Sequence, residues 1–185
     1  AFSSHIHRIQ QVLDAAHHDG RFVALVGRSL LRNFNIATGL GIVTVPDGVL
    51  INIKSIDDHA DDELVIVTTG SQGEPLSGLR RMAYGDHQNV TIRPRDTVIF
   101  SSRIVPGNEL AVNETINRLV GAGARIVSPD SAPVHVSGHA HSDELRLMLR
   151  LVRPTFFAPI HGELRHQRAH AEIAKTLGVP SERTF

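Results

Sequence analysis

Histidine and glycine residues gather in one part of this sequence, between Pro133 and Glu163. The stretch reads P-V-H-V-S-G-H-A-H-S-D-E, continues through a segment with helical spacing, and ends in F-F-A-P-I-H-G-E. Neutral imidazole offers a lone pair to a metal or a hydrogen bond to a phosphate, and glycine lacks the Cβ atom that would keep a ligand from the backbone. The turns around His135 and His161 are therefore the first candidates for a phosphate or metal site.

One string in this region resembles part of a metal-binding motif. His139-Ala-His141-Ser-Asp143 has the spacing of the H-x-H-x-D core of metallo-hydrolases, but Glu144 stands where that motif has a further histidine. A carboxylate such as Asp143 is also favoured in the first turn of a helix by the helix dipole. We therefore favour a helix start over a complete metal site at this string.

His161 is placed differently, because it directly follows an apolar run expected to be a buried strand, residues 155–160. A strand end can hold the ring rigidly, and Glu163 offers a carboxylate to orient it. His161 can supply one metal ligand, but zinc takes four, so its partners must come from elsewhere. His166 and His170 are four residues apart and could chelate a metal, yet this spacing is more typical of a solvated helix face.

Composition limits the classes of protein. With 185 residues, 41% hydrophobic and 21% charged, the chain suits one or two ordinary globular domains. It has no cysteine, so a zinc site would need histidine and carboxylate ligands. The formal net charge of zero argues only against broad non-specific binding of nucleic acid, and local patches can still bind phosphates. No apolar run reaches membrane-spanning length and no signal peptide opens the sequence, so we expect a cytoplasmic protein.

Apolar runs alternate with helical patterns over most of the chain. Strands are expected at 22–27, 64–68, 97–101 and 124–127, and helices at 3–19, 29–38 and from 110 to about 120. The alternation predicts a mainly parallel sheet with right-handed crossovers, in a three-layer αβα arrangement. The loop Thr69-Gly-Ser-Gln-Gly-Glu-Pro75 follows a strand, at the edge where α/β sheets place their ligands.

The start of the first helix is a second candidate site. Ser3 or Ser4 is expected to cap it, and Ser4 and His5 lie where free backbone amides could hold an anion. A plain capped helix is the alternative interpretation. The acidic stretch from Asp57 to Glu63 is interpreted as a solvated loop or helix start.

The last part of the sequence predicts a helix over 145–152, ended by Pro154, then the strand at 155–160 and a helix over 164–177, ended by Gly178. The sequence begins at Ala1 without methionine and ends at Phe185 without a polar tail. We expect both ends to be cuts in a longer protein.

Four motifs, in this order and spacing, resemble those of the ribonuclease J family within the β-CASP metallo-β-lactamase group: T-G-S-Q-G-E-P, S-S-R-I-V-P-G-N-E, H-V-S-G-H-A and P-I-H-G-E. The opening S-S-H-I-H-R-I-Q-Q-V resembles the same enzymes, so the likeness covers essentially the whole chain. The resemblance implies a β-CASP domain over residues 1–143. It also implies that residues 144–185 are a strand-helix segment returning to the metallo-β-lactamase domain.

The resemblance also implies roles for individual residues. His139, in S-G-H-A, would be catalytic, contacting the scissile phosphate or assisting proton transfer, and His161, in H-G-E, would ligate one of two zinc ions. A nucleotide phosphate pocket is implied by the family at Ser4, His5, Ile6, His135, Val136, Ser137, Gly138, His139 and Ala140. His5 stands where the family pattern suggests asparagine.

The implied activity is that of a zinc-dependent hydrolase acting on single-stranded RNA. Members cleave as 5′-to-3′ exonucleases and endonucleases in RNA decay and maturation, with a 5′ monophosphate end favoured. A homo-oligomer and association with other RNA-decay proteins are implied as well. The H-x-H-x-D-H motif that supplies most zinc ligands is missing and is expected before Ala1, so the chain alone is not expected to be a competent nuclease.

Two other classes of protein share some of these features. A nucleotide- or flavin-binding doubly wound domain would share the strand-helix alternation, but the sequence contains neither G-x-G-x-x-G nor G-x-x-x-x-G-K-[ST]. A non-catalytic RNA-binding or assembly module remains the alternative, and zinc analysis would discriminate between it and a nuclease.

Overall fold

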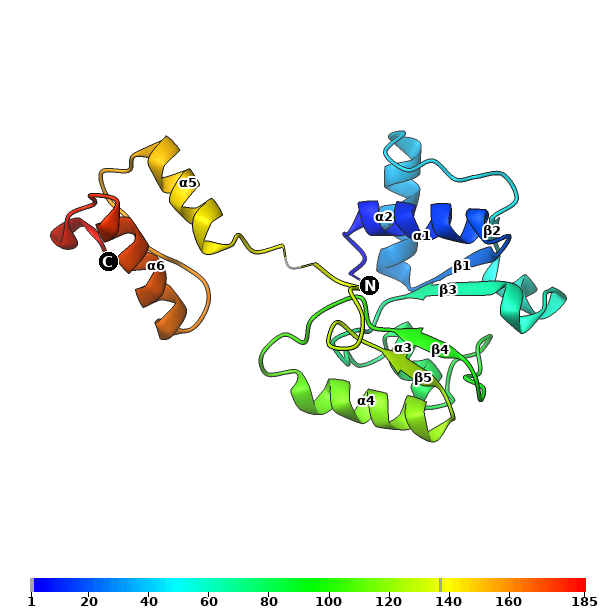
Figure 1. Cartoon of the computed structure of the whole chain (residues 1–185). Coiled ribbons are helices and arrows are strands. Elements are labelled where there is room, and N and C mark those ends of the chain that lie inside the picture. The colour runs from blue at the N-terminus through cyan, green and yellow to red at the C-terminus, as the bar shows by residue number, and fades with distance from the viewer. Residues whose placement is uncertain (1, 137) are drawn as a thin grey trace. The chain divides into compact units, whose positions relative to one another are not determined.

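The structure is a computed structural model that describes residues 2–136 and 138–185 (Figure 1). The chain forms two compact units that divide between Val136 and Ser137. Each unit has its own hydrophobic core, and we describe them in turn.

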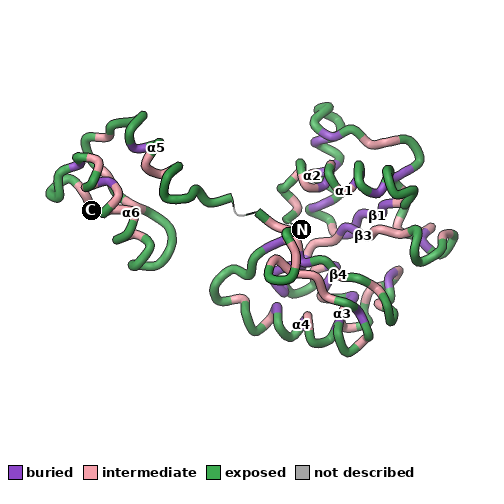
Figure 2. The backbone as a smooth tube through the Cα atoms, in the orientation of Figure 1, coloured by how far each residue is buried: buried purple, intermediate pink, exposed green. Residues whose placement is uncertain are grey.

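The first unit is organised around strand β1 (Phe22–Val26), the central strand of a three-stranded parallel sheet. It pairs with β2 (Leu50–Ile51) on one side and with β3 (Leu64–Thr68) on the other. Four of its five residues are buried, as the continuous apolar run predicts for a strand covered on both faces (Figure 2).

Alternate residues of β1 enter two different cores. Val23 and Leu25 pack with α1 (Ile6–His18) and α2 (Arg28–Gly39), which together cover one face of the sheet. Ala24 and Val26 point to the other face, where the core includes residues of the 3-10 helix η1 (Ile53–Asp58) and of α3 (Gly78–Ala83). This alternation is the two-residue period of a strand, and it places helical segments on both sides of the sheet.

A second parallel pair, β4 (Thr97–Ile99) and β5 (Arg125–Val127), is connected by α4 (Glu109–Gly121). Helices α3 and α4 share a core with this pair, built on Leu79, Phe100, Val112, Leu119 and Ala124. The prediction of a parallel α/β fold is confirmed. All four strands predicted for this unit form, although only the one at 64–68 has its full expected length, and the strands lie in sheets of three and two.

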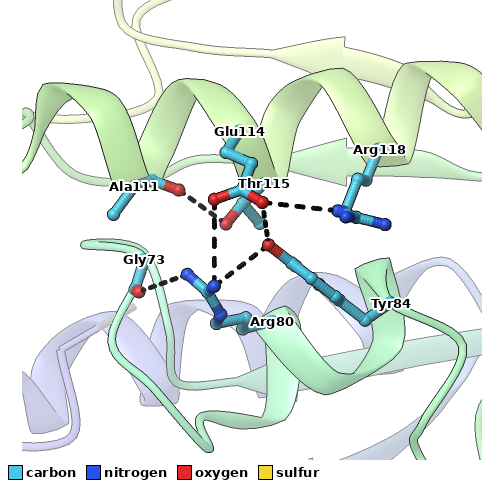
Figure 3. A network of polar contacts seen from close by, with 7 residues as sticks. All are labelled: Gly73, Arg80, Tyr84, Ala111, Glu114, Thr115 and Arg118. Atoms are coloured by element: carbon cyan, nitrogen blue, oxygen red, sulfur yellow. Dashed lines mark hydrogen bonds and ion pairs between the residues drawn. The ribbon is translucent and has the colours of Figure 1, made fainter.

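Polar side chains tie α3 to α4 (Figure 3). The Tyr84 hydroxyl donates to the Glu114 carboxylate and accepts from Arg80 Nη2 at 3.0 Å, while the Arg118 guanidinium carbon lies 3.7 Å from the Tyr84 ring centroid. The hydrogen bond from Tyr84, followed by the charges of Arg80 and Arg118, lowers the pKa of Glu114. The carboxylate therefore stays ionised at neutral pH.

Gln72 fastens two of the sequence motifs to each other. Its buried side chain donates from Nε2 to the Arg103 carbonyl at 2.8 Å, and its Oε1 accepts from the Val105 amide at 2.8 Å. The next residue, Gly73, has φ +69°, and a Cβ there would lie 2.6 Å from the Ala111 carbonyl carbon. Only glycine tolerates both conditions, so T-G-S-Q-G-E-P and S-S-R-I-V-P-G interlock structurally.

The acidic residues between Asp57 and Glu63 lie mainly in two short 3-10 helices. Asp57 and Asp58 end η1, and η2 (Asp61–Glu63) follows. Asp61 forms an ion pair with Arg93. The interpretation of this stretch as a solvated loop or helix start is confirmed. Strand β2 and helix α3 were not predicted.

The second unit consists of α5 (Ser142–Val152), α6 (Leu164–Thr176) and the 3-10 helix η3 (Ser181–Arg183). Both α-helices were predicted, and their small core is Leu149, Ala174 and Val179. None of the helices in the described ranges is both long and apolar enough to cross a membrane.

The predicted strand at 155–160 is wrong. Phe157 forms an isolated parallel bridge with Thr184, and Ile160 is 85% exposed. A strand needs backbone partners along its length, and within residues 138–185 this segment pairs only at that bridge. The apolar composition was read correctly, but the buried ladder that it implies is not formed by this unit.

Candidate functional site

Helix α1 is capped by a histidine. His5 is the N-cap, and its Nδ1 accepts a hydrogen bond from the Arg8 amide at 3.2 Å. The prediction that Ser3 or Ser4 caps the helix is wrong, and the Ser3 carbonyl instead accepts from Asn33 Nδ2 at 3.0 Å. Asparagine is also a common N-cap residue, because its side-chain oxygen accepts from a backbone amide in the same way.

Arg8 joins this helix start to two distant parts of the first unit. Its Nη1 donates to the Ser101 carbonyl at 2.6 Å, and its Nη2 lies 3.3 Å from His135 Nδ1. Because a guanidinium can only donate, Nδ1 of His135 must accept, and the neutral ring carries its proton on Nε2. Ser101 Oγ donates to the Val134 carbonyl at 2.6 Å, which holds the end of β4 against the His135 segment. We call Arg8, Ser101 and His135, with His5, the Arg8 cluster.

Burial and charge set the protonation of the Arg8 cluster. The pKa of His135 is lowered by burial first and then by the positive charges of Arg8 and Arg103, while a hydrogen bond to the Ser101 backbone acts in the opposite direction. Burial also lowers the pKa of Arg8, yet a guanidinium stays charged at any physiological pH. At neutral pH the cluster is thus a half-buried cation beside a neutral imidazole, an environment that favours an anion.

The other predicted phosphate-binding residues are placed less distinctively. Ser4, Val136, Gly138 and Ala140 are exposed, and Val136 is 80% exposed. Ile6 is the first residue of α1 and packs against the main core, which gives it a structural role. Ser137 lies outside the described residues.

In the second unit, His139 and His161 lie next to each other. Their rings are nearly parallel, at an interplanar angle of 8° with centroids 5.4 Å apart. His161 has φ +71° in a turn before α6 and does not end a strand, so that expectation is wrong. No group of three or more metal-ligating side chains occurs in the described ranges. These two imidazoles can supply two of the four ligands that zinc takes.

Neighbouring histidines have structural contacts. His141 is the N-cap of α5 and Asp143 lies in its first turn, which confirms the helix start favoured over a metal motif. His166 Nδ1 accepts from the Glu163 amide at 3.2 Å, and the half-buried His170 packs edge-on against Phe157 with ring centroids 4.8 Å apart. The interpretation of these two as a plain solvated face is therefore incomplete.

Arg8 was missed by the sequence analysis, although it lies inside a motif that was singled out. Its partners Ser101 and His135 are 93 and 127 residues away, so no local spacing shows the contact. The available signal was a basic residue one turn into a helix whose start was already a candidate anion site.

Two family models match the chain. The family model for the ribonuclease J β-CASP domain matches residues 1–119, and the model for the Zn-dependent metallo-hydrolase RNA specificity domain matches residues 129–182. The predicted domain boundary at residue 143 stays a prediction beside the division at 136 in the structure.

Ribonuclease J proteins match the chain over nearly its whole length. The protein of Thermus thermophilus is 48% identical over 100% of this chain and 32% of its own length. The proteins of Mycobacterium tuberculosis and Helicobacter pylori are 45% and 41% identical over 98% and 100% of this chain, and 32% and 27% of their own lengths. The chain thus spans about a third of the length of these curated relatives.

A parallel α/β unit followed by an RNA-specificity segment defines a protein of the β-CASP class. Within that class, the chain belongs to the ribonuclease J family.

Proposed function

We propose that the chain is the RNA-binding and part-catalytic portion of a zinc-dependent ribonuclease. The proposed enzyme hydrolyses RNA phosphodiesters, as a 5′-to-3′ exonuclease and an endonuclease, in cytoplasmic RNA decay and maturation. The observation that carries the proposal is the Arg8 cluster, a half-buried cation with a neutral imidazole, in a chain whose relatives are named ribonuclease J.

The proposed task of the Arg8 cluster is to hold the 5′-terminal monophosphate of the RNA. Arg8 offers positive charge, and the hydroxyl of the exposed Ser4 offers a further donor. Hydrogen bonds from charged donors to phosphate are about twice as strong as neutral ones, so Arg8 should dominate binding. Phosphate would also favour protonation of His135, because a nearby anion stabilises the imidazolium.

His139 and His161 are proposed to act at the bond that is cleaved. His161 would ligate one of two zinc ions, and His139 would contact the scissile phosphate or move its proton. Bound zinc lowers the pKa of water, so that hydroxide forms near neutral pH. The remaining ligands would come from the further length that the relatives have, and a homo-oligomer is proposed for the whole enzyme.

Substitution of Arg8 tests the proposal. Arg8→Gln in the full-length enzyme should weaken binding of 5′-monophosphorylated RNA about ten- to a hundredfold, because one hydrogen bond from a charged group to the phosphate is lost. Cleavage of a circular RNA should fall less, since it has no end to hold. Arg21→Gln, at an exposed site after α1, is the matched control. Equal loss on both RNAs would show that Arg8 does not read the terminal phosphate.

A non-catalytic RNA-binding or assembly module is the second candidate. Its supporting observation is that His139 and His161 offer only two imidazoles to a metal. RNA binding by a zinc-loaded full-length protein that cleaves neither linear nor circular RNA would favour this candidate.

A further inference from the structure

A hollow lies at the edge of the first sheet where β1 and β3 end side by side. The two strands are parallel and in register from Phe22 opposite Leu64 to Val26 opposite Thr68, so their carboxyl ends meet. From β1 the chain passes through α2 to β2, whereas from β3 it continues to α3 and the β4–β5 pair (Figure 1). Diverging connections of this kind leave a crevice that α/β proteins use for ligands.

The hollow has a volume of about 480 Å³, within the range of small-molecule sites. Its ionisable lining residues are Arg28, Arg81 and His87, and its apolar ones are Val26, Leu31 and Leu76. We call it the strand-end hollow. It shares no residue with the Arg8 cluster.

The charge of the strand-end hollow is positive and unneutralised. No carboxylate lines it, and within the described ranges neither guanidinium takes part in an ion pair. Arg81 Nη2 donates to the Asp86 carbonyl at 2.9 Å, which fixes the side chain without cancelling its charge. Asp86 itself lines a smaller hollow that shares Leu76 and Arg81 with the strand-end hollow. Two like charges placed together repel each other, so an anion between them stabilises the arrangement.

The start of α2 adds backbone donors to the same place. Its N-cap, Gly27, makes no side-chain capping bond, and no acidic residue occupies the first turn. The first intrahelical bond runs from the Leu31 amide to the Gly27 carbonyl, so the amides of residues 28–30 have no acceptor inside the helix. Gly27 has φ +124°, and a Cβ there would lie 2.8 Å from Thr69 Oγ1. Glycine therefore lets the two strand ends approach each other and leaves the amides uncovered.

His87 is held as a neutral donor. Its Nδ1 accepts from the Val90 amide at 3.1 Å and the Asn89 amide at 3.3 Å, so the ring proton is on Nε2. Burial, followed by the charge of Arg81, lowers the pKa of His87, which keeps the ring neutral near pH 7.

The apolar wall narrows the class of ligand. Leu31 and Leu76 are both exposed, and Leu76 is 88% exposed with φ +63°. A left-handed backbone conformation costs free energy for leucine, and Leu76 adopts it at the rim of the hollow. A bare anion would make no favourable contact with this apolar side chain. A ligand with an anionic group beside an apolar or aromatic face would use both parts of the hollow.

We propose that the strand-end hollow binds the phosphate group of a nucleotide. Arg28, Arg81, the Nε2–H of His87 and the first amides of α2 hold the phosphate oxygens, and Leu31 and Leu76 contact the base or sugar. A phosphodiester within an RNA strand and a free nucleotide present this same chemistry. The inference goes beyond the proposed nuclease and does not depend on zinc or cleavage.

The test uses the 185-residue chain with Arg8→Gln as background, so that the Arg8 cluster does not contribute. Uridine 5′-monophosphate, a single-stranded ten-nucleotide RNA without a terminal phosphate, and inorganic phosphate are titrated by calorimetry. Arg28→Gln and Arg81→Gln should each weaken binding about ten- to a hundredfold. Arg125→Gln, an exposed residue of β5, is the matched control and should leave affinity unchanged. Since Arg28 and Arg81 are exposed, both variants should keep the unfolding midpoint of the background.

Each outcome decides the proposal. Binding of the monophosphate identifies a free nucleotide as a ligand, and binding of the RNA alone identifies the strand. In the RNA arm, each substitution should reduce the slope of log K against log salt by about 0.7. The histidine proton resonance of His87 should shift with either ligand and not with uridine. Absence of binding by both ligands, affinity unchanged by either substitution, or binding of inorganic phosphate alone would overturn the proposal.

Discussion

At the scale of single residues, the central feature of the Arg8 cluster is a half-buried cation whose two hydrogen-bond partners are neutral. The Arg8 guanidinium donates hydrogen bonds to the Ser101 carbonyl and to His135, and neither partner carries a negative charge. A half-buried guanidinium without a carboxylate is unfavourable by itself, because desolvation is not compensated. A bound phosphate would compensate it, which is why the first unit is expected to become more stable when the ligand is present.

Acidification should destabilise the first unit. The folded state lowers the pKa of His135 below the unfolded value of about 6.5, so the unfolded chain binds more protons between these two values. Stability is therefore fully present above about pH 6.5 and is lost as the pH falls towards the folded pKa. His87 contributes in the same direction.

Urea unfolding at pH 7.5 and 5.5 measures this dependence. His135→Asn should reduce the loss of unfolding free energy between the two pH values. The control is His18→Asn, whose side chain is 88% exposed. An unchanged difference in His135→Asn would contradict the assignment of the pH dependence to the Arg8 cluster.

At the scale of elements, the loops between strands and helices do most of the positioning. The buried Gln72 side chain hydrogen-bonds the backbone at Arg103 and Val105, which joins the two loops to each other. Glycines at positions 27 and 73 allow approaches that any side chain would block. The family motifs of the first unit are thus largely a framework for the strand ends.

Gln72→Ala should lower the free energy of unfolding by about 0.5–1.5 kcal/mol for each hydrogen bond that the buried Gln72 side chain loses. The affected groups are the Arg103 carbonyl and the Val105 amide. Gln88→Ala, at an exposed site in the same unit, should change it by less than about 0.5 kcal/mol. Urea unfolding of both variants makes the comparison. Similar values for the two would show that the loops are held by other contacts.

Local sequence patterns predicted those elements well whose formation depends mainly on their own residues. The helices α1, α2, α4, α5 and α6 follow from apolar spacing, and the continuous run at β1 indicates burial on both faces. Strand β2 has two residues, too few for any period to show. The segment 155–160 has strand composition, but a strand is completed by its neighbours, and composition does not say whether they are present.

The candidate site was predicted in part for the same reason. His5 and His135 were named from motifs, whereas Arg8, Arg28 and Arg81 depend on contacts between distant segments. Arginine on a helix surface is common, and only the fold shows which ones face a hollow.

At the scale of the whole molecule, the second unit buries little. Its core has three buried residues, while apolar side chains along α5 and after it stay exposed, among them Leu147, Met148, Leu151, Val152, Phe156 and Ile160. Apolar faces of this extent mark interaction surfaces. We propose that residues 144–185 complete a metallo-β-lactamase domain in the full-length enzyme, which would cover this face and supply strand partners to residues 155–160.

The same incompleteness predicts how the protein handles zinc. His139 and His161 can fill at most two of four ligand positions, and a two-ligand site does not hold zinc tightly against water. The 185-residue chain should therefore lose its zinc on dialysis, while the full-length enzyme retains it.

In the full-length enzyme, His161→Ala should lower the zinc content and abolish most of the cleavage of a labelled RNA, because a metal ligand is removed. His166→Ala is the control within the same unit, since that imidazole accepts from the Glu163 amide at the start of α6. Metal analysis and cleavage rate are measured on the same samples. If the zinc content and rate of His161→Ala equal those of the control, His161 is not a ligand, and tight stoichiometric zinc in the 185-residue chain would show that this unit contains a complete site.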